Sequence, residues 1–583
     1  MKRKIPFQHA HSHLSSRILR IFTGFALLTH LQAAPVATLW NVENGDWLTP
    51  TNWSNGLPGD LSPDTSQAVF NVTADSPAQS DVTLGSAATF DFLGVGFGKT
   101  VNLSLGDGAY LSGKSIQVGR FVSGATVQAA HWNIYGPATG QATIAWSSFL
   151  QIGGSPTGSG ATVTFSGANL NILDSGSNVT VGRQGNGHTL TIQNGAKYSG
   201  KGAIVSGTTA ISSGVGNNHK LIVTGAGSEM TLSGLSGSTS TLGLIVGSRP
   251  LTGSNSSNVQ SGNTVEVSDG GKLSVIGDNP DATVSVLVGA ATYRVNNSIQ
   301  VTGANSLLEI TGNVKTTIGL DNLSSYNNRL SVSDGGTIRM EGQLIIQNGA
   351  STAANRRNIL DIGDGGTLLT SGTIISEGGL VRLHENGSLR GESLLGAPQA
   401  VTLSINRTGR FEATGSGLGQ TVSVQIGDGT NEAVLAMGGA GRTSASTLVI
   451  DSAMTLNEHS ALEVSIFGSN AMDAIQLGEN SSFSLDDNVK LSILLSGYTL
   501  QLGDSYQLFT GESGHVVGSF ASIVQPTLEN GLSWDWSNFN EAGNWTFTVV
   551  PEPSSLWLLI GGLVVFGLHR AHKQRKASPG HMC

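Results

Sequence analysis

The sequence predicts an all-β protein whose body is a parallel β-helix with a small β cap at its C-terminal end. Composition is the first observation behind this prediction. Glycine supplies 80 of the 583 residues and charged residues only 12%, which is typical of short strands joined by many tight turns. The second observation is a repeat, because alternating segments closed by a glycine turn recur along the body at intervals of about 30 residues.

The repeat can be followed through seven segments that align on a central apolar residue. These residues are Val163, Leu190, Leu221, Val265, Ile299, Leu330 and Leu360. Their spacings are 27, 31, 44, 34, 31 and 30 residues, and a Ser/Asn-rich insertion around residues 253–262 accounts for the longest. Alternation points Val, Ile and Leu inward and Thr, Ser, Gln and Lys outward.

Each unit has room for three short strands. A second run, such as residues 272–276, follows the glycine turn. A third run ends in an apolar residue followed by glycine, as in Val118-Gly119, Val181-Gly182, Val246-Gly247, Val288-Gly289 and Ile318-Gly319. Three strands in about 30 residues fit a parallel β-helix, whose coils stack about 4.8 Å apart. The rival fold, a series of Greek-key sandwiches, repeats at about 100 residues.

Asparagines recur at the start of these units. They are Asn217, Asn218, Asn296, Asn297, Asn327, Asn328 and Asn358, each just before the first strand of its unit. Stacked coils place such amides above one another, so we expect a hydrogen-bonded ladder with a structural role.

The two ends of the chain differ from the body. Residues 1–34 contain five basic residues, no acidic ones and an apolar run at 21–28, the order found in a secretory signal peptide cut near Ala33 or Ala34. The expected organisation is a signal peptide at 1–34, β-helix repeats at 35–450, a C-terminal β module at 451–548 and a sorting tail at 549–583.

The tail has three parts in a fixed order. It begins with Val550, Pro551, Glu552 and Pro553, continues as an apolar run at 556–568 and ends in a basic segment at 569–576 that contains Arg570, Lys573, Arg575 and Lys576. This order fits a stiff spacer, a short transmembrane helix and a basic anchor on the cytoplasmic side. Thirteen apolar residues span only about 20 Å of a core of about 30 Å, which suits a temporary anchor. An ordinary tail anchor is the alternative.

The tail resembles the PEP-CTERM sorting signal of Gram-negative bacteria. This resemblance implies cleavage near Pro551-Glu552-Pro553 by an exosortase, and export in a bacterium that makes exopolysaccharide. Residues 40–548 resemble the β-strand repeats of autotransporter passenger domains, through an entry segment with Trp40, Trp47 and Trp53 and a closing segment near 503–535.

Three motifs suggest chemistry. Residues 94–100 look like a nucleotide-binding loop, but position 93 is Leu where the motif needs Gly, and a strand pattern follows where it needs a helix. Asp-Gly steps at Asp107, Asp269, Asp334, Asp364 and Asp428 are consistent with calcium, yet the nine-residue calcium repeat is absent, which favours turns. We therefore expect no cofactor and no metal.

Catalytic carboxylates are a further candidate. Asp361 and Asp364, with Arg329, Arg339, Arg356 and Arg357 near them in sequence, are the candidates for a polysaccharide lyase or hydrolase. Asp361 and Asp364 are an odd number of residues apart, which places them on opposite faces of a straight strand. We expect these charges to be solvated edges.

Tryptophans gather near both ends of the body. Trp40, Trp47 and Trp53 lie at the start, and Trp534, Trp536 and Trp545 at the end. Such residues either stack on sugars or cap the open apolar ends of a solenoid, and we expect caps.

These observations together predict a non-enzymatic, exported, structural or adhesive protein. Between its basic ends the body has a net charge of −18, which disfavours nucleic acid. The expected partners are signal peptidase, Sec-type export machinery, an exosortase and an exopolysaccharide or envelope glycan. The expected location is the inner membrane transiently, then the cell surface or matrix. A polysaccharide lyase or hydrolase and a glycan-binding module remain the alternatives.

Overall fold

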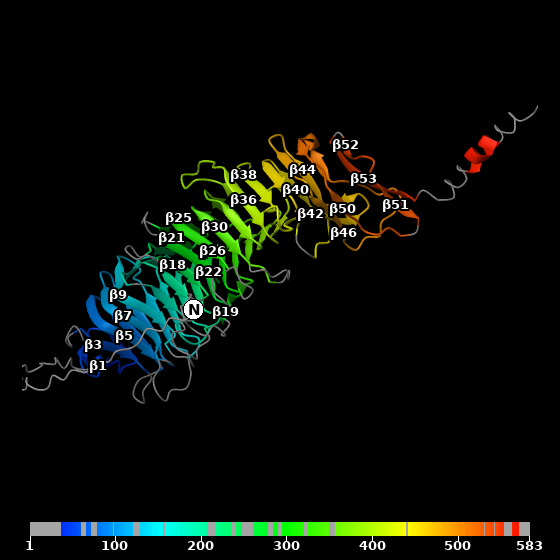
Figure 1. Cartoon of the computed structure of the whole chain (residues 1–583). Coiled ribbons are helices and arrows are strands. Elements are labelled where there is room, and N and C mark those ends of the chain that lie inside the picture. The colour runs from blue at the N-terminus through cyan, green and yellow to red at the C-terminus, as the bar shows by residue number, and fades with distance from the viewer. Residues whose placement is uncertain are drawn as a thin grey trace, which may run out of the picture.

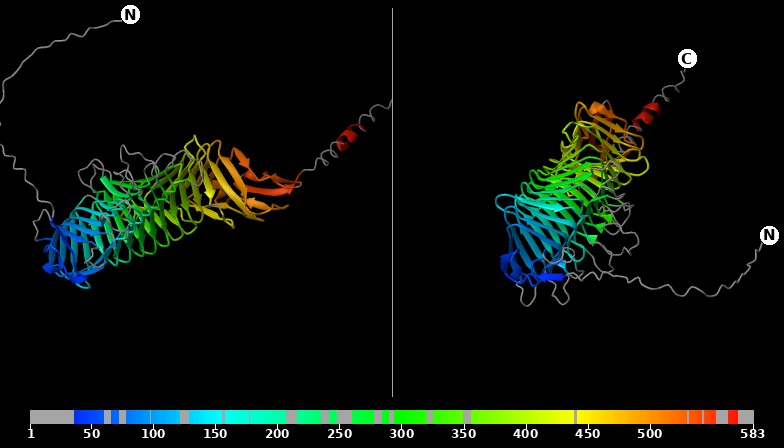
Figure 2. Two further views of the ribbon diagram at one scale, coloured as in Figure 1. Left: turned by 90° about the horizontal axis from the view of Figure 1, so that it is seen from below. Right: turned by 90° about the vertical axis from the view of Figure 1, so that its left-hand side faces the viewer.

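The chain forms an elongated stack of short parallel strands that runs from the N-terminal to the C-terminal part of the body (Figures 1 and 2). The computed structural model describes residues 36–59, 66–71, 78–96, 98–120, 129–154, 158–176, 178–206, 216–234, 241–247, 260–277, 284–289, 294–319, 325–348, 356–438, 441–529, 531–541, 543–552 and 563–570. Nearly all regular structure in these ranges is β-strand, so the all-β, solenoid-like prediction is confirmed.

Three parallel ladders build the stack. The first ladder contains β2 (Asn44–Asp46), β4 (Gln79–Leu84), β6 (Thr100–Leu105), β8 (His131–Tyr135), β10 (Thr162–Ser166), β13 (Thr189–Gln193), β16 (Lys220–Thr224), β20 (Thr264–Ser268), β24 (Ser298–Thr302), β28 (Arg329–Ser333), β31 (Ile359–Ile362), β34 (Leu380–Leu383), β37 (Arg410–Ala413), β39 (Val434–Met437), β42 (Ala461–Gly468), β46 (Lys490–Leu495) and β50 (Ser522–Val524).

The second and third ladders share three long strands near the N-terminus. These are β5 (Ala87–Gly96), β7 (Tyr110–Arg120) and β9 (Ala142–Ile152), preceded by β1 (Val36–Leu39) and β3 (Ser66–Phe70). The second ladder continues with β11 (Leu170–Asp174), β14 (Lys197–Gly200), β17 (Glu229–Leu232), β21 (Lys272–Gly277), β25 (Leu307–Gly312), β29 (Thr337–Met340), β32 (Thr367–Thr370) and β35 (Ser388–Gly391). The third continues with β12 (Val179–Val181), β15 (Ala203–Val205), β18 (Thr241–Val246), β22 (Val284–Val288), β26 (Val314–Ile318), β30 (Gln343–Gln347), β33 (Ile374–Glu377), β36 (Val401–Asn406), β38 (Val422–Ile426), β41 (Ala453–Leu456), β45 (Ser482–Leu485) and β49 (Val516–Val517).

Shorter elements complete the fold. Two small parallel sheets contain β19 (Gln260–Ser261), β23 (Arg294–Val295) and β27 (Ser325–Tyr326), and β40 (Thr447–Ile450), β44 (Ala474–Leu477) and β48 (Phe509–Gly511). Antiparallel pairing involves β43 (Ala471–Met472) against β42, and β47 (Ser505–Gln507), β51 (Leu532–Asp535) and β52 (Phe539–Glu541) against β53 (Asn544–Pro551). The 3-10 turns are η1 (Pro50–Asn52) and η2 (Ser513–His515).

The register of the first ladder matches the sequence repeat. All seven aligned apolar residues, from Val163 to Leu360, are direct neighbours on consecutive strands. The apolar residues of the apolar–glycine steps, such as Val181 and Val246, likewise stack in the third ladder. All these side chains are buried in one continuous core. Parallel pairing does not stop at residue 450, the boundary expected from the sequence, but continues to Ser522–Val524.

A polar ladder runs inside one corner of the stack. Its rungs are His188, His219, Asn263, Asn297, Asn328 and Asn358, and all are fully buried. Each asparagine Oδ1 accepts the backbone N–H of the rung before it, as Asn328 does for Asn297 at 3.2 Å, and the Asn297 Nδ2 also donates to it at 3.0 Å. The expected ladder is therefore present, because every coil turns this corner at the same place.

Membership of this ladder differs in part from the sequence prediction. Asn218, Asn296 and Asn327 are turn residues with positive φ rather than rungs. Asn217 joins a separate outer contact, in which its N–H donates to the Asn186 Oδ1 at 3.0 Å. Asn263 and the two histidines are further rungs, which a search for Asn-Asn pairs misses. Asn263 is preceded by a glycine instead of a second asparagine, and the other two rungs are histidines.

Glycines of the third ladder make room for these rungs. A Cβ on Gly289 would lie 2.1 Å from the Asn328 Cγ, and a Cβ on Gly182 would lie 2.2 Å from the His219 ring. Both glycines have positive φ. The apolar–glycine step thus turns the chain and at the same time leaves space for a polar rung of the next coil.

Candidate functional site

The N-terminal tryptophans are buried. Trp40, Trp47 and Trp53 are 0%, 1% and 3% exposed, and they pack on Phe70 with ring centroids 5.4 to 6.0 Å away. The Trp53 Nε1 donates to the Trp47 carbonyl at 2.8 Å. Their ring faces are covered by the first coil, so they cap this end of the stack and have no face open to a sugar.

The C-terminal end is closed in the same way. Trp545 is buried and packs edge-on against Phe509 and Phe539, at 5.0 and 5.2 Å between ring centroids. Trp534 and Trp536 are half-buried over the same cluster.

The sorting motif begins inside the last strand. Val550 and Pro551 end β53 and pair with Ser533 and Leu532 of β51. The Glu552 N–H donates to the Gly531 carbonyl at 2.7 Å. Pro553 lies outside the described residues.

The expected membrane segment is only partly described. Residues 563–570 are helical and include Arg570, and their apolar side chains are exposed. Residues 556–562 and the basic residues Lys573, Arg575 and Lys576 lie outside the described ranges. Within the described ranges, no helix has the length and apolar character needed to cross a membrane.

The loop at residues 94–100 joins two strands. Gly94 and Gly96 belong to β5, the Lys99 N–H donates to the Gly96 carbonyl at 3.3 Å, and β6 begins at Thr100. Lys99 is fully buried, and burial lowers its pKa to about 8. No helix follows the turn, so the geometry of a phosphate-binding loop is not formed.

The Asp-Gly steps serve as turns. The Asp428 carboxylate accepts the backbone N–H groups of Thr430 and Asn431 at 2.9 and 3.0 Å, and these hydrogen bonds hold its pKa well below the usual range despite the opposing effect of desolvation. Asp269 and Asp334 have positive φ. Among the described residues no group of three or more His, Cys, Asp or Glu side chains is placed to hold a metal ion.

The predicted carboxylate candidates are separated. Asp361 is buried on the outer side of β31, where it pairs with Arg329 and with the His384 Nε2 at 3.0 Å. Burial, followed by the nearby Arg382 charge, lowers the pKa of His384. Asp364 is exposed in the following turn. The two carboxylates do not form one site, and Asp361 is not a solvated edge.

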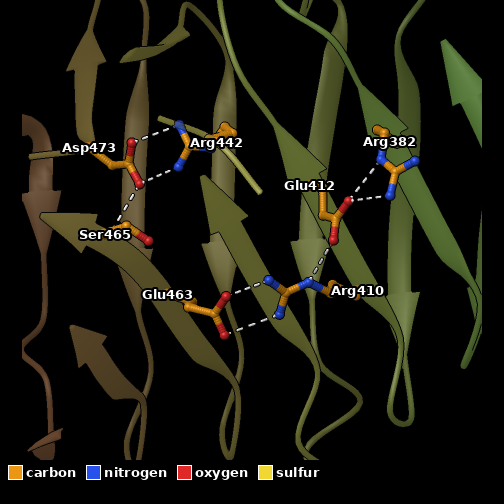
Figure 3. A network of polar contacts seen from close by, with 7 residues as sticks. All are labelled: Arg382, Arg410, Glu412, Arg442, Glu463, Ser465 and Asp473. Carbon is orange, nitrogen blue, oxygen red and sulfur yellow. Dashed lines mark hydrogen bonds and ion pairs between the residues drawn. The ribbon is translucent and has the colours of Figure 1, made fainter. Parts of the chain in front are cut away.

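Beyond Asp361 the outer face of the first ladder carries a network of arginines and carboxylates (Figure 3). The Glu412 carboxylate accepts from the Arg382 Nε at 2.8 Å and from the Arg410 Nε at 3.0 Å. Arg410 also holds Glu463 through both terminal nitrogens. Arg382 comes from β34, Arg410 and Glu412 from the same face of β37, and Glu463 from β42, so the network clamps these three strands together.

A second ion pair lies beside this network. Asp473 is fully buried and binds Arg442 through both oxygens, at 2.6 and 2.9 Å. The Ser465 N–H also donates to Asp473, at 2.9 Å (Figure 3). The Arg442 guanidinium carbon lies 5.0 Å from the centre of the Phe467 ring, a cation–π contact.

These residues border a groove of about 560 Å³, which we call the arginine groove. Its described lining comprises Arg357, Leu380, Arg382, Arg410, Glu412, Met437, Gly438, Gly441, Arg442, Glu463, Ser465, Phe467, Leu494, Leu495 and Ser496. Charged, hydroxyl, aromatic and aliphatic side chains are mixed in it, as in a polar ligand site.

Sequence reasoning named only Arg357 among the charged residues of this groove. Its charged residues are spread along the chain from Arg357 to Glu463, and Arg410 and Glu463, which pair, are 53 residues apart. The signal that could have found them is the register, since Asp361, Arg382 and Glu412 are direct neighbours on successive strands.

A second groove of about 680 Å³ follows the loops around β35. Its described charged residues are Glu385, Arg390, Glu392 and Asp451. It is therefore acidic, in contrast to the arginine groove, and Glu392 is already paired with Arg339 at 3.3 Å.

No protein-family model and no curated protein matches the chain. One similar solved structure is a TibC-catalysed, hyper-glycosylated fragment of TibA. It is 14% identical, the alignment covers 76% of this chain and 100% of that one, and the TM-score is 0.25. A likeness this distant carries no argument about function.

Proposed function

We propose that the chain is an exported structural or adhesive protein of the cell surface or exopolysaccharide matrix. The observation that carries this proposal is the unbroken stack of parallel coils, closed by aromatic clusters at both ends. Such a stack is a stiff rod whose side faces expose many hydroxyl and amide groups and few charges. That surface suits extended contact with a hydrated polymer.

The tail supplies the second part of the proposal. An exosortase cuts near Pro551-Glu552-Pro553 after export, and the apolar run at 556–568 anchors the protein in the inner membrane until then. The position of the motif supports this, because β53 ends at Pro551. A cut beyond that point leaves every strand of the C-terminal cap intact.

The enzyme alternative requires carboxylates grouped with arginines on one outer face, and such a group is present in the arginine groove. Its carboxylates, however, already accept hydrogen bonds from guanidinium groups, as Glu412 does from Arg382 and Arg410. A general acid and a general base need a free carboxyl within reach of the scissile bond. This pairing favours a structural or binding role for the face.

The tail is tested by replacing Pro551-Glu552-Pro553 with alanines in the native host. The variant should remain in the membrane fraction, while a matched change in a surface loop, Pro398→Ala, should leave release unchanged. Normal release of the triple variant would overturn the sorting proposal.

The role of the rod is tested with the host exopolysaccharide. Incubation with the purified chain should leave the polymer size unchanged in gel filtration, and the protein should co-elute with the polymer. A shortened polymer would instead establish the lyase or hydrolase alternative.

A further inference from the structure

The arginine groove, counted together with the Asp473 carboxylate behind it, contains one more positive than negative charge. Arg382 and Arg410 are matched by Glu412 and Glu463, and Arg442 is matched by the buried Asp473 behind it. The remaining cation of the lining is Arg357. A surplus positive charge is notable here, because the body as a whole is strongly acidic.

Arg357 makes no ion pair with any residue that the structure describes, and its Nη1 is buried without a hydrogen-bond partner there. Burial, followed by repulsion from Arg410, lowers the pKa of Arg357. The Arg357 side chain as a whole is half-buried and lines the groove, so an anion bound beside its accessible part would offset this unpaired charge.

We propose that the arginine groove binds the carboxylate groups of an acidic polysaccharide, one built from uronic acid units, with Arg357 as the carboxylate contact. This inference rests on the proposed function and names the polymer class. The planar guanidinium matches a carboxylate with two parallel hydrogen bonds, which a neutral sugar cannot offer.

The rest of the lining favours a sugar polymer over an acidic peptide. Phe467, Leu494 and Leu495 offer apolar surfaces to the C–H faces of a pyranose ring, and Ser465 and Ser496 place hydroxyl groups beside them. Sugar sites commonly combine such surfaces, because a pyranose has apolar faces and a polar edge.

The direction of the groove also fits a linear polymer. Its strands β34, β37, β39 and β42 belong to successive coils of the first ladder, which repeat about every 4.8 Å along the rod. An extended chain of linked pyranoses that lies along the rod therefore passes about one coil per sugar unit.

Affinity electrophoresis of the full chain tests the proposal, with polygalacturonate, neutral dextran and polyglutamate as probes in separate gels. Polygalacturonate should retard the native chain more than the other two polymers. Arg357→Gln should weaken polygalacturonate binding roughly ten-fold, because a charge-assisted pair is lost. Arg339→Gln is the control, since it removes the same charge from an arginine that lies outside the arginine groove and is already paired with Glu392, and it should bind like the native chain.

A variant that is expected to tighten binding distinguishes a lost contact from damage to the fold. Glu463→Gln frees one side of Arg410 and should tighten binding of polygalacturonate, whereas simple damage to the fold would weaken it. Thermal melts of all variants establish that they are folded.

The outcomes separate this inference from the proposed function. Equal retardation by dextran and polygalacturonate would overturn the carboxylate contact and leave the rod as a glycan adhesin. Stronger retardation by polyglutamate would overturn the polysaccharide in favour of an acidic peptide. Loss of co-elution with the host exopolysaccharide would count against the proposed function itself.

Discussion

Acid should destabilise the rod through the two histidine rungs of the inner ladder. His188 and His219 stack with ring centroids 5.2 Å apart and an interplanar angle of 6°. The His188 Nδ1 accepts the Ala161 N–H at 3.0 Å, and the His219 Nδ1 accepts the His188 N–H at 3.2 Å. A proton on either Nδ1 would remove an acceptor and place a charge in the core.

Burial accordingly lowers both pKa values. The pKa of His188 falls to about 4, and that of His219 to about 3 with a further contribution from repulsion by His188. The unfolded chain has histidine pKa values near 6.5 and binds protons first as the pH falls. The stabilisation by neutral histidines is therefore present above about pH 6.5 and is lost progressively toward pH 4 and 3.

The size of the effect follows from these values. At pH 5 the unfolded state is protonated at both histidines while the native state is not, which removes about 2 kcal/mol per histidine and about 4 kcal/mol for the pair relative to pH 7.5. This loss is a large share of the stability of one segment of the rod, because coils in a solenoid are stabilised mainly by their neighbours.

The assay is hydrogen exchange of peptides that cover residues 183–224, at pH 7.5 and pH 5, after correction for the intrinsic pH dependence of exchange. The double variant His188→Asn/His219→Asn extends the asparagine ladder with side chains that do not titrate in this range. It should lose most of the pH dependence that the native chain shows, while peptides over the coils of Asn328 and Asn358 serve as an internal control.

Equal pH dependence in the native chain and the double variant would refute this reasoning. So would a native chain whose protection in residues 183–224 is the same at both pH values, because the lowered pKa values require the unfolded state to take up protons first.

Two further predictions concern single positions of the inner face. Gly289→Ala should destabilise the rod by roughly 2 kcal/mol or more, since the new Cβ would meet Asn328. The control, Gly108→Ala, should cost less, because Gly108 also has a positive φ of +72 but nothing lies within 4 Å of the added Cβ. Equal shifts of the urea midpoint in the two variants would contradict the steric argument. Asp174 has a pKa raised to about 6 by burial, in spite of the Tyr198 hydrogen bond that opposes it, so its contribution to stability falls by about 3 kcal/mol in total as the pH rises from below 4 to above 6. Asp174→Asn should flatten this part of the pH profile of urea unfolding, and an unchanged profile would show that the carboxyl is not desolvated.

The strand repeat could be predicted from the sequence because it depends on local alternation and a constant coil length. Val163, Leu190 and Leu221 are in register since each unit repeats the same inward position. The caps could be predicted for a similar reason, because a solenoid needs bulky apolar residues such as Trp47 at its open ends.

The groove could not be predicted because its residues meet only through the register of coils that depart from the usual length. Leu360 and Val381 are neighbours although they are 21 residues apart, well short of the earlier spacing. Side-chain pairing such as Arg410 with Glu463 then crosses further strands. Charge pairs of this kind leave no periodic signal in a single sequence.

The two polar arrays of the rod have opposite consequences for binding. Inside, each rung from Asn263 to Asn358 supplies the acceptor that its neighbour needs, so the ladder is complete and offers nothing to a ligand. Outside, the pairing of arginines with carboxylates stops at Arg357, whose Nη1 has no acceptor among the described residues. Between Asn263 and Asn358 the regular repeat of the coils satisfies the polar side chains of the ladder. An unpaired charge at the point where the coils shorten is therefore the best place on this rod to expect an anionic partner.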